Sequence, residues 1–215
     1  PLIVWNLLLL RKHGITEVMI NLHHLGHLIE NELGDGGKFN MRLSYSYEPI
    51  LLGTGGGIKQ VEWFFHGESF VVMNGDTLVD LDLSLLVSFH RERSALATMV
   101  VREDPDPDRW GAVELDKNQG VLRINGRGRT SDAPAARAKR MFAGVHLMHT
   151  RLLRSVPKEQ ASSIIDAYVR EIEWGERVCG FTMHGYWSDI GTPDRYTQAQ
   201  RDVATGLIHL AGPFP

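Results

Sequence analysis

Two aspartates in this 215-residue sequence each follow a short apolar run and could bind a metal ion. Asp76 closes the stretch V-V-M-N-G-D and Asp189 closes Y-W-S-D, so we expect both at the ends of strands. In open α/β sheets, ligands bind outside the carboxyl ends of the strands, where two such carboxylates could meet at one ion. Mg²⁺ is usually held by one or two carboxylates together with substrate phosphates. The two positions therefore predict a magnesium site.

Each aspartate also has a plainer interpretation, in which it only organises a turn. The sequence N-G-D at 74–76 has the composition of an ordinary turn, and Asp189 could serve only the strand-to-helix turn that follows it. Asp80 is a nearby alternative ligand, whereas Asp82 is better placed as the N-cap of the next helix.

A glycine cluster, L-G-T-G-G-G-I at 52–58, lies between a strand-like run and a helix-like run. Clusters in that setting often hold phosphates. This one is not G-x-x-x-x-G-K-[ST], because Gln60 follows Lys59, and it is not G-x-G-x-x-G, because Ile58 stands at the last position. The cluster also follows a strand with one polar face and lacks the ribose-binding acid of a dinucleotide site. A dinucleotide-binding oxidoreductase is therefore disfavoured.

Composition narrows the class of protein. The length suits one α/β domain, or one with a small appendage, and no apolar run approaches the roughly 20 residues of a membrane span. A single cysteine, Cys179, excludes an internal disulfide and suits a reducing cytoplasm. A net charge of −3 argues against a general nucleic-acid or membrane surface. We expect a cytoplasmic protein without nucleic-acid or membrane partners, and an oligomer is possible.

Alternating helix and strand patterns must position the candidate residues. The expected helices cover 1–13, 25–33, 58–65, 83–94, 164–174 and 193–204, and the expected strands cover 17–21, 42–47, 69–73, 96–102, 143–148 and 178–183. This order predicts βαβ units in a Rossmann-like, doubly wound, mixed but mostly parallel sheet. From about residue 105 the pattern changes, and a hairpin around 117–120 predicts a small β appendage.

Two further patterns have plain interpretations. His23 and His27 have the spacing of metal ligands on a helix, but we expect the helix to start after His23, which favours turn or surface packing. The run at 123–140 holds six cationic residues against Asp132 alone, and we expect a solvated loop there.

The motifs taken together resemble the sugar-1-phosphate nucleotidyltransferases. Their order is L-G-T-G-G-G-I, V-x-N-G-D, W-G-A-V-E, F-A-G-V-H and W-S-D-I-G-T-P, and the resemblance covers almost the whole chain. It implies an enzyme that joins a nucleoside triphosphate to a sugar 1-phosphate, giving a nucleotide sugar and pyrophosphate, with Mg²⁺ as cofactor. The glycine motif is most similar to the N-acetylmuramate-1-phosphate uridylyltransferase branch, and heptose- and mannose-1-phosphate guanylyltransferases share much of the pattern.

The resemblance also implies roles for individual residues. Asp76 and Asp189 would be the catalytic, metal-binding pair. Those expected to bind the nucleotide are Glu48, Leu52, Gly53, Thr54, Gly55, Gly56, Asn74 and Gly75. Those expected to bind the sugar phosphate are Gly111, Ala143 and Gly144. The chain would be a single domain, with 1–104 as the nucleotide-binding part and 105–215 as the sugar-phosphate-binding part.

Two family features are missing from the sequence. The G-x-G-T-R loop that wraps the triphosphate is absent, because the chain begins where the following helix should begin, and we expect that upstream residues exist. The Glu-Lys-Pro of many members is replaced by the basic run, and which cation takes the place of its lysine stays open. The alternative is a catalytically weak relative that binds nucleotide sugars or a regulatory partner.

Overall fold

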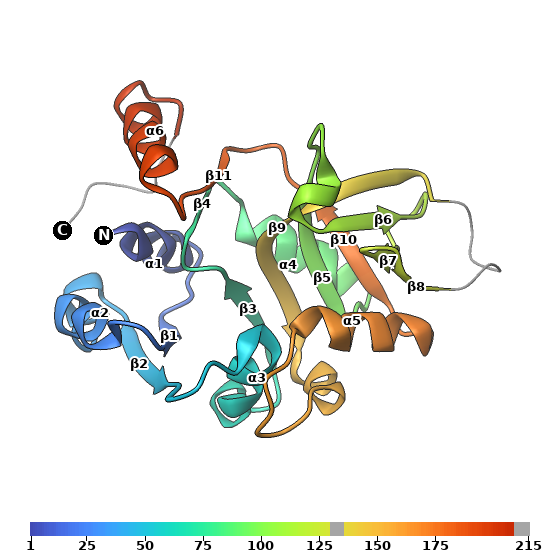
Figure 1. The fold of residues 1–215 in the computed structure, drawn as a ribbon, viewed down its shortest axis with the longest axis horizontal. Coiled ribbons are helices and arrows are strands. Elements are labelled where there is room, and N and C mark those ends of the chain that lie inside the picture. Colours follow the sequence, from blue (N-terminus) through green and yellow to red (C-terminus); the bar gives the residue numbers. More distant parts are fainter. Residues whose placement is uncertain (130–135, 209–215) are drawn as a thin grey trace. The chain divides into compact units, whose positions relative to one another are not determined.

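The computed structural model describes residues 1–129 and 136–208, which form two compact units (Figure 1). Each unit is built from segments that are distant along the chain. Unit 1 comprises Pro1–Ile50, Met73–Ser84 and the described part of Gly185–Pro215, and unit 2 comprises Leu51–Val72 and Leu85–His184.

Unit 1 contains two small sheets and three α-helices. A parallel pair is formed by β1 (Glu17–Leu22) and β2 (Arg42–Tyr47), and an antiparallel pair by β4 (Thr77–Val79) and β11 (Trp187–Asp189). The helices are α1 (Leu2–Lys12), α2 (Gly26–Leu33) and α6 (Pro193–Ala204), with a 3₁₀ turn η1 (Gly37–Phe39). Leu78, Ile190 and Ala199 are buried together, so β4, β11 and α6 share one apolar cluster.

Unit 2 is built on a seven-stranded sheet. Its order is β10-β5-β9-β6-β7-β8, and β3 also pairs with β9. The strands are β3 (Ser69–Met73), β5 (Ala97–Arg102), β6 (Ala112–Leu115), β7 (Val121–Ile124), β8 (Arg127–Gly128), β9 (Ala138–His149) and β10 (Val178–Thr182). The remaining elements are α3 (Gly53–Gln60), α4 (Leu83–Glu92), α5 (Ile164–Glu173), η2 (Glu62–Phe65), η3 (Pro107–Trp110) and η4 (Thr150–Ser155).

The α/β class is confirmed, but the prediction of a mostly parallel sheet with a β appendage is wrong. The pair β10–β5 is parallel, whereas β5–β9, β6–β9, β6–β7 and β7–β8 are antiparallel. Short hairpin turns connect β6, β7 and β8, and a hairpin cannot make the crossover that parallel strands need. The predicted hairpin exists, and its strands are part of the main sheet.

Most predicted elements are confirmed, and two differ. The helix expected at 58–65 instead begins at Gly53 and ends at Gln60, with 62–65 forming the 3₁₀ turn η2. The strand expected at 143–148 begins earlier, at Ala138, so the basic run is only partly a loop. Asp132 lies outside the described residues. The charged side chains of Lys139 and Arg140 hid the start of β9, because they interrupt the apolar pattern of a buried strand.

The core of unit 2 lies between its sheet and α5. Ile164, Ala167, Tyr168 and Ile172 follow helical spacing and are all buried, which makes one apolar face. This helix packs against β7, β8 and β10 (Figure 1). Ser163 caps it by accepting a hydrogen bond from the backbone N–H of Ile165. Within 1–129 and 136–208, no helix combines the length and apolar character that crossing a membrane requires.

Candidate active site

The two candidate metal ligands lie on neighbouring strands of unit 1. In the β4–β11 pair, Asp189 is opposite Thr77, the residue after Asp76. The backbone N–H of Ile190 donates to the carbonyl oxygen of Asp76 at 2.9 Å, which continues the ladder past the strand ends. Antiparallel pairing therefore brings together two aspartates that are far apart along the chain.

Their carboxylates point toward the same glycine. A Cβ placed on Gly191 would lie 3.2 Å from Asp189 Oδ1 and 3.8 Å from Asp76 Oδ2. The two oxygens are therefore no further apart than the sum of these distances. Their charge and their hard oxygen donors suit Mg²⁺, which takes one or two protein carboxylates and fills its other positions with water and phosphate. Among the described residues, no group of three or more His, Cys, Asp or Glu side chains could hold a metal ion by itself.

The alternative aspartates have other positions. Asp80 follows β4 at the end opposite Asp76, and its N–H donates to the carbonyl oxygen of Tyr186 at 2.9 Å. Asp82 Oδ1 accepts the N–H of Ser84 at 2.8 Å, so its predicted role as the cap of α4 is confirmed.

Asp189 has two partners that orient it. Its Oδ1 accepts the N–H of Gly191 at 2.9 Å and lies 3.1 Å from Arg195 Nη1. Thr192 caps α6 and Pro193 occupies its first turn, which places Arg195 on the side of Asp189. Sequence analysis did not single out Arg195, although the cap signal at 192–193 and the acid just before it were available to indicate the pair.

Tyr186 holds α6 against β11. Its hydroxyl donates to Asp202 Oδ2 at 2.6 Å. Burial, reinforced by this hydrogen bond, raises the pKa of Tyr186 to about 12. The phenol therefore stays protonated as a donor at neutral pH, and the helix that carries Arg195 is joined to the strand that carries Asp189.

The other residues of unit 1 that are expected to bind the nucleotide differ in solvent exposure. Asn74 and Gly75 are exposed in the turn before β4, and the side chain of Asn6 donates to the Asn74 carbonyl at 3.2 Å. Glu48 is only 3% exposed, and its Oε1 accepts from Asn21 Nδ2 at 2.8 Å. His23 Nδ1 contacts the Glu48 carbonyl oxygen at 2.6 Å, which agrees with turn packing rather than metal binding.

The glycine cluster forms the first turns of α3 in unit 2 and packs against the chain itself. A Cβ on Gly53 would lie 2.7 Å from the carbonyl oxygen of Ser162, and one on Gly56 would lie 2.6 Å from that of Gln160. The N–H of Gly55 donates to the Ser162 carbonyl at 2.8 Å. These glycines therefore allow α3 to approach the segment before α5, which is a packing requirement that the sequence did not reveal.

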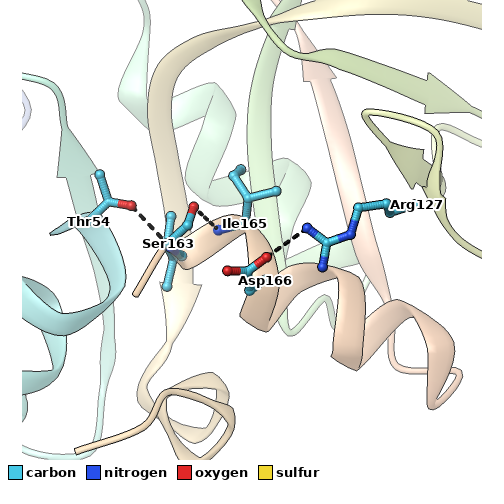
Figure 2. A network of polar contacts seen from close by, with 6 residues as sticks. Thr54, Arg127, Ser163, Ile165 and Asp166 are labelled. Atoms are coloured by element: carbon cyan, nitrogen blue, oxygen red, sulfur yellow. Dashed lines mark hydrogen bonds and ion pairs between the residues drawn. The ribbon is translucent and has the colours of Figure 1, made fainter. Parts of the chain in front are cut away.

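Thr54 links the glycine cluster to the start of α5, as Figure 2 shows. Its Oγ1 accepts the N–H of Ile164 at 3.0 Å, and Ser163 Oγ accepts that of Ile165 at 3.2 Å. The next residue of α5, Asp166, accepts a hydrogen bond from the Arg127 guanidinium at 2.7 Å (Figure 2). Leu52 completes the junction, because its carbonyl oxygen accepts the N–H of Ser162 at 2.8 Å.

The residues expected to bind the sugar phosphate lie in or beside β9, an interior strand of unit 2. Gly111 has a φ of +92°, and its carbonyl oxygen accepts the N–H of Phe142 at 3.3 Å. Ala143 is fully buried, and Gly144 has a φ of +75° within a β-bulge, where the register with β5 shifts. Such a bulge favours glycine and turns the local backbone out of the regular ladder.

Comparison with known proteins places this chain in a family. A family model described as nucleotidyl transferase matches residues 1–206. The chain belongs to the nucleotidyl transferase family.

Several named proteins are similar to this nucleotidyl transferase in sequence. The chain is 32% identical to N-acetylmuramate alpha-1-phosphate uridylyltransferase of Neisseria meningitidis, over 93% of this chain and 84% of that protein. It is 30% identical to UTP–glucose-1-phosphate uridylyltransferase of Synechocystis, over 97% of this chain and 56% of the relative. It is 28% identical to mannose-1-phosphate guanylyltransferase of Mycobacterium tuberculosis, over 90% of this chain and 53% of the relative. The chain thus spans little more than half the length of the last two.

The nucleotidyl transferase fold is also seen in solved structures. HddC from Yersinia pseudotuberculosis superposes with a TM-score of 0.75 at 20% identity, over 93% of this chain and 84% of that one. At this level of identity the likeness establishes the fold.

Most of the cations in the basic run at 123–140 have acidic partners in unit 2. Arg123 pairs with Glu114 at 3.0 Å, Lys139 with Asp108 at 2.6 Å and Arg140 with Glu103 at 2.7 Å. These pairs lie on strands β7 and β9, so the expectation of a solvated loop is wrong for them. Their acidic partners are distant in sequence, which is why the run looked unbalanced.

Proposed function

We propose that this protein condenses a nucleoside triphosphate with a sugar 1-phosphate, releasing pyrophosphate and an NDP-sugar. Family membership supports this reaction class. The observation that carries the proposal is the convergence of Asp76 and Asp189 beside Gly191. Two carboxylates on adjacent strands are the protein contribution expected for a Mg²⁺ ion that also binds substrate phosphates.

The reaction requires little covalent chemistry from the protein. The attacking oxygen belongs to a phosphate monoester that carries about −1.5 to −2 charges at neutral pH, so no general base is needed. The residues must instead place this oxygen in line with the α-phosphorus and limit the repulsion between two anions. When bound, Mg²⁺ would supply neutralisation of the phosphate charges.

Individual residues have distinct proposed tasks. Asp76 and Asp189 would hold the ion, and the N–H of Gly191 and the guanidinium of Arg195 keep the Asp189 carboxylate in place. Asn74 and Gly75, exposed at the end of β3, would contact the nucleotide.

The other residues named by the resemblance also have proposed roles in substrate binding. The segment 52–56 would contact the nucleoside through Gly53 and Thr54, which are exposed, whereas Gly55 and Gly56 are buried against 160–164. Gly111, Ala143 and Gly144 would contact the sugar phosphate, with the positive φ of both glycines shaping the backbone there. For Glu48, a role in base recognition would require exchange of its bond to Asn21.

The proposal is tested by pyrophosphate release from a panel of nucleoside triphosphates and sugar 1-phosphates. We expect Asp76→Asn and Asp189→Asn each to lower Mg²⁺-dependent turnover by about 10²-fold or more, because each removes a charge from the ion. Asp80→Asn is the matched control at the other end of β4 and should retain turnover. Near-normal turnover in either of the first two variants would reject the metal assignment. Nucleotide-sugar binding without any turnover of the wild type would instead favour the non-catalytic relative.

A further inference from the structure

A cavity of about 680 Å³ lies at the amino ends of two parallel strands in unit 2. β5 begins at Ala97 and β10 begins at Val178, which are partners in the register. Arg93 and Arg177, located shortly before these strands, line the cavity. The strands end at Arg102 and Thr182, so the cavity is at the edge opposite their carboxyl ends.

The β6–β7 turn closes another side of the cavity. Gly120 forms a bridge with Cys179, and the carbonyl oxygen of Gln119 accepts the N–H of Gly180 at 2.8 Å. The turn and β10 are thus connected by backbone hydrogen bonds, and the cavity wall is held by main chain rather than by side chains alone. None of the residues that we assign to the substrates lines this cavity.

The cavity lining carries more positive than negative side chains. Its cationic residues are Arg93, Lys117, Arg129 and Arg177, and its acidic residues are Asp116 and Glu176. Both acids already have partners, since Asp116 Oδ1 accepts the N–H groups of Asn118 and Gly120, which also line the cavity, at 2.7 and 2.9 Å. Glu176 Oε2 pairs at 3.1 Å with Arg151, which is not part of the lining.

The cations, in contrast, keep unused donors. Arg177 Nη1 donates to the carbonyl oxygen of Arg93 at 2.7 Å, which uses one of its several N–H groups. The Arg93 guanidinium lies 3.7 Å from the centroid of the Phe89 ring, and its Nη1 lies 3.9 Å from Glu92 Oε2, a long ion pair that leaves its other N–H groups as donors. Across residues 1–129 and 136–208, neither Lys117 nor Arg129 has an ion-pair partner.

We propose that this cavity binds a phosphorylated small organic molecule, at a site separate from the proposed substrate residues. Guanidinium groups match the geometry of phosphate oxygens and bind them through paired, charge-assisted hydrogen bonds. The cavity volume falls in the range of about 300–1,000 Å³ that small-molecule sites occupy, and it exceeds what a phosphate group needs. The chain as a whole is acidic, with a net charge of −3, so the attraction is a local property of this cavity.

The test is isothermal titration of the protein with glucose 6-phosphate, AMP and inorganic phosphate. Glucose 6-phosphate lacks an anomeric phosphate and AMP lacks a pyrophosphate leaving group, so neither can turn over. The double variant Lys117→Ala/Arg129→Ala removes two cavity cations. Arg154→Ala/Lys158→Ala is the matched control, because it removes the same charge from exposed positions of unit 2 outside the lining.

We expect at least one ester to bind the wild type more tightly, by about tenfold or more, than it binds Lys117→Ala/Arg129→Ala, because the variant lacks two cations that could donate charged hydrogen bonds to its phosphate. The control should bind like the wild type, and thermal unfolding should show that both variants are folded. The single variant Lys117→Ala, at an exposed position, gives the same comparison if the double variant unfolds. Equal ester affinities in the wild type and the cavity variants, or binding of inorganic phosphate alone, would overturn the proposal. Neither result bears on pyrophosphate release, which tests the proposed reaction independently.

Discussion

The guanidinium of Arg195 lies 3.1 Å from Asp189 Oδ1, so the carboxylate that we assign to Mg²⁺ already has a cationic neighbour. The two side chains are 35% and 28% exposed, and a pair of this kind contributes only about 0–1 kcal/mol to folding. Its importance is therefore expected in ligand binding rather than in stability.

Replacing this arginine should strengthen metal binding. In Arg195→Ala, the Mg²⁺ concentration for half-maximal pyrophosphate release should fall by about two- to fivefold, because a like charge beside the ion is removed while the N–H of Gly191 still orients Asp189. Arg201→Ala, on the same helix but without a recorded contact to Asp189, should leave the Mg²⁺ requirement unchanged. A higher or unaltered Mg²⁺ requirement in Arg195→Ala would contradict this view of the pair.

The glycine at 56 should be required for folding as well as for any ligand contact. In Gly56→Ala, the new Cβ would meet the Gln160 carbonyl oxygen at 2.6 Å and the Leu52 Cβ at 2.8 Å. Overpacking of this kind costs about 1–3 kcal/mol, more than the helix propensity of alanine returns. Urea unfolding measures the loss. Gly75→Ala, where the added Cβ meets nothing within 4 Å, should unfold like the wild type, and equal losses in both would argue against close packing at Gly56.

Thr54 should stabilise the start of α5. Thr54→Val keeps the shape of the side chain but removes the acceptor for the Ile164 N–H, so the free energy of unfolding should fall by about 0.5–2 kcal/mol. Hydrogen exchange at the Ile164 amide should also become faster. Thr54→Ser, which keeps the hydroxyl, is the matched variant and should retain slow exchange. Slow exchange in Thr54→Val would show that the hydrogen bond does not protect this amide.

A buried histidine in unit 2 should make stability depend on pH. Burial lowers the pKa of His146 to about 3, and its Nδ1 contacts the Tyr168 hydroxyl at 2.5 Å. In the unfolded chain a histidine has a pKa of about 6.5, so below that pH the unfolded state binds a proton that the folded state does not. The contribution of neutral His146 to the free energy of unfolding is therefore complete above about pH 6.5 and is lost as the pH falls toward 3.

The expected slope of this loss is about 1.4 kcal/mol per pH unit. Urea unfolding between pH 7 and 4.5 should show a shallower decline for His146→Gln than for the wild type. His24→Gln, at an exposed position, should follow the wild-type slope. The pKa of His90 is also lowered by burial, so part of the slope should persist in His146→Gln. Parallel curves for His146→Gln and the wild type would exclude His146 as a source of the pH dependence.

The sequence by itself determined the features that depend on neighbours along the chain. Local composition predicts most strands and several helix boundaries, because each signal lies within a few residues of its effect. Examples are the start of α6 at Thr192–Pro193 and the cap at Asp82. The order of motifs also identified the family, since that order is carried by the sequence itself.

Tertiary structure decided which distant segments meet. The approach of Asp76 and Asp189, the ion pairs of the basic run and the antiparallel partners of β9 all join residues that are far apart along the chain. The glycines at 53–56 have the composition of a ligand loop, and only the position of Ser162 shows that their missing side chains make room for the chain itself. Periodicity and composition record how a segment is buried, whereas strand direction and side-chain partners depend on which surface buries it.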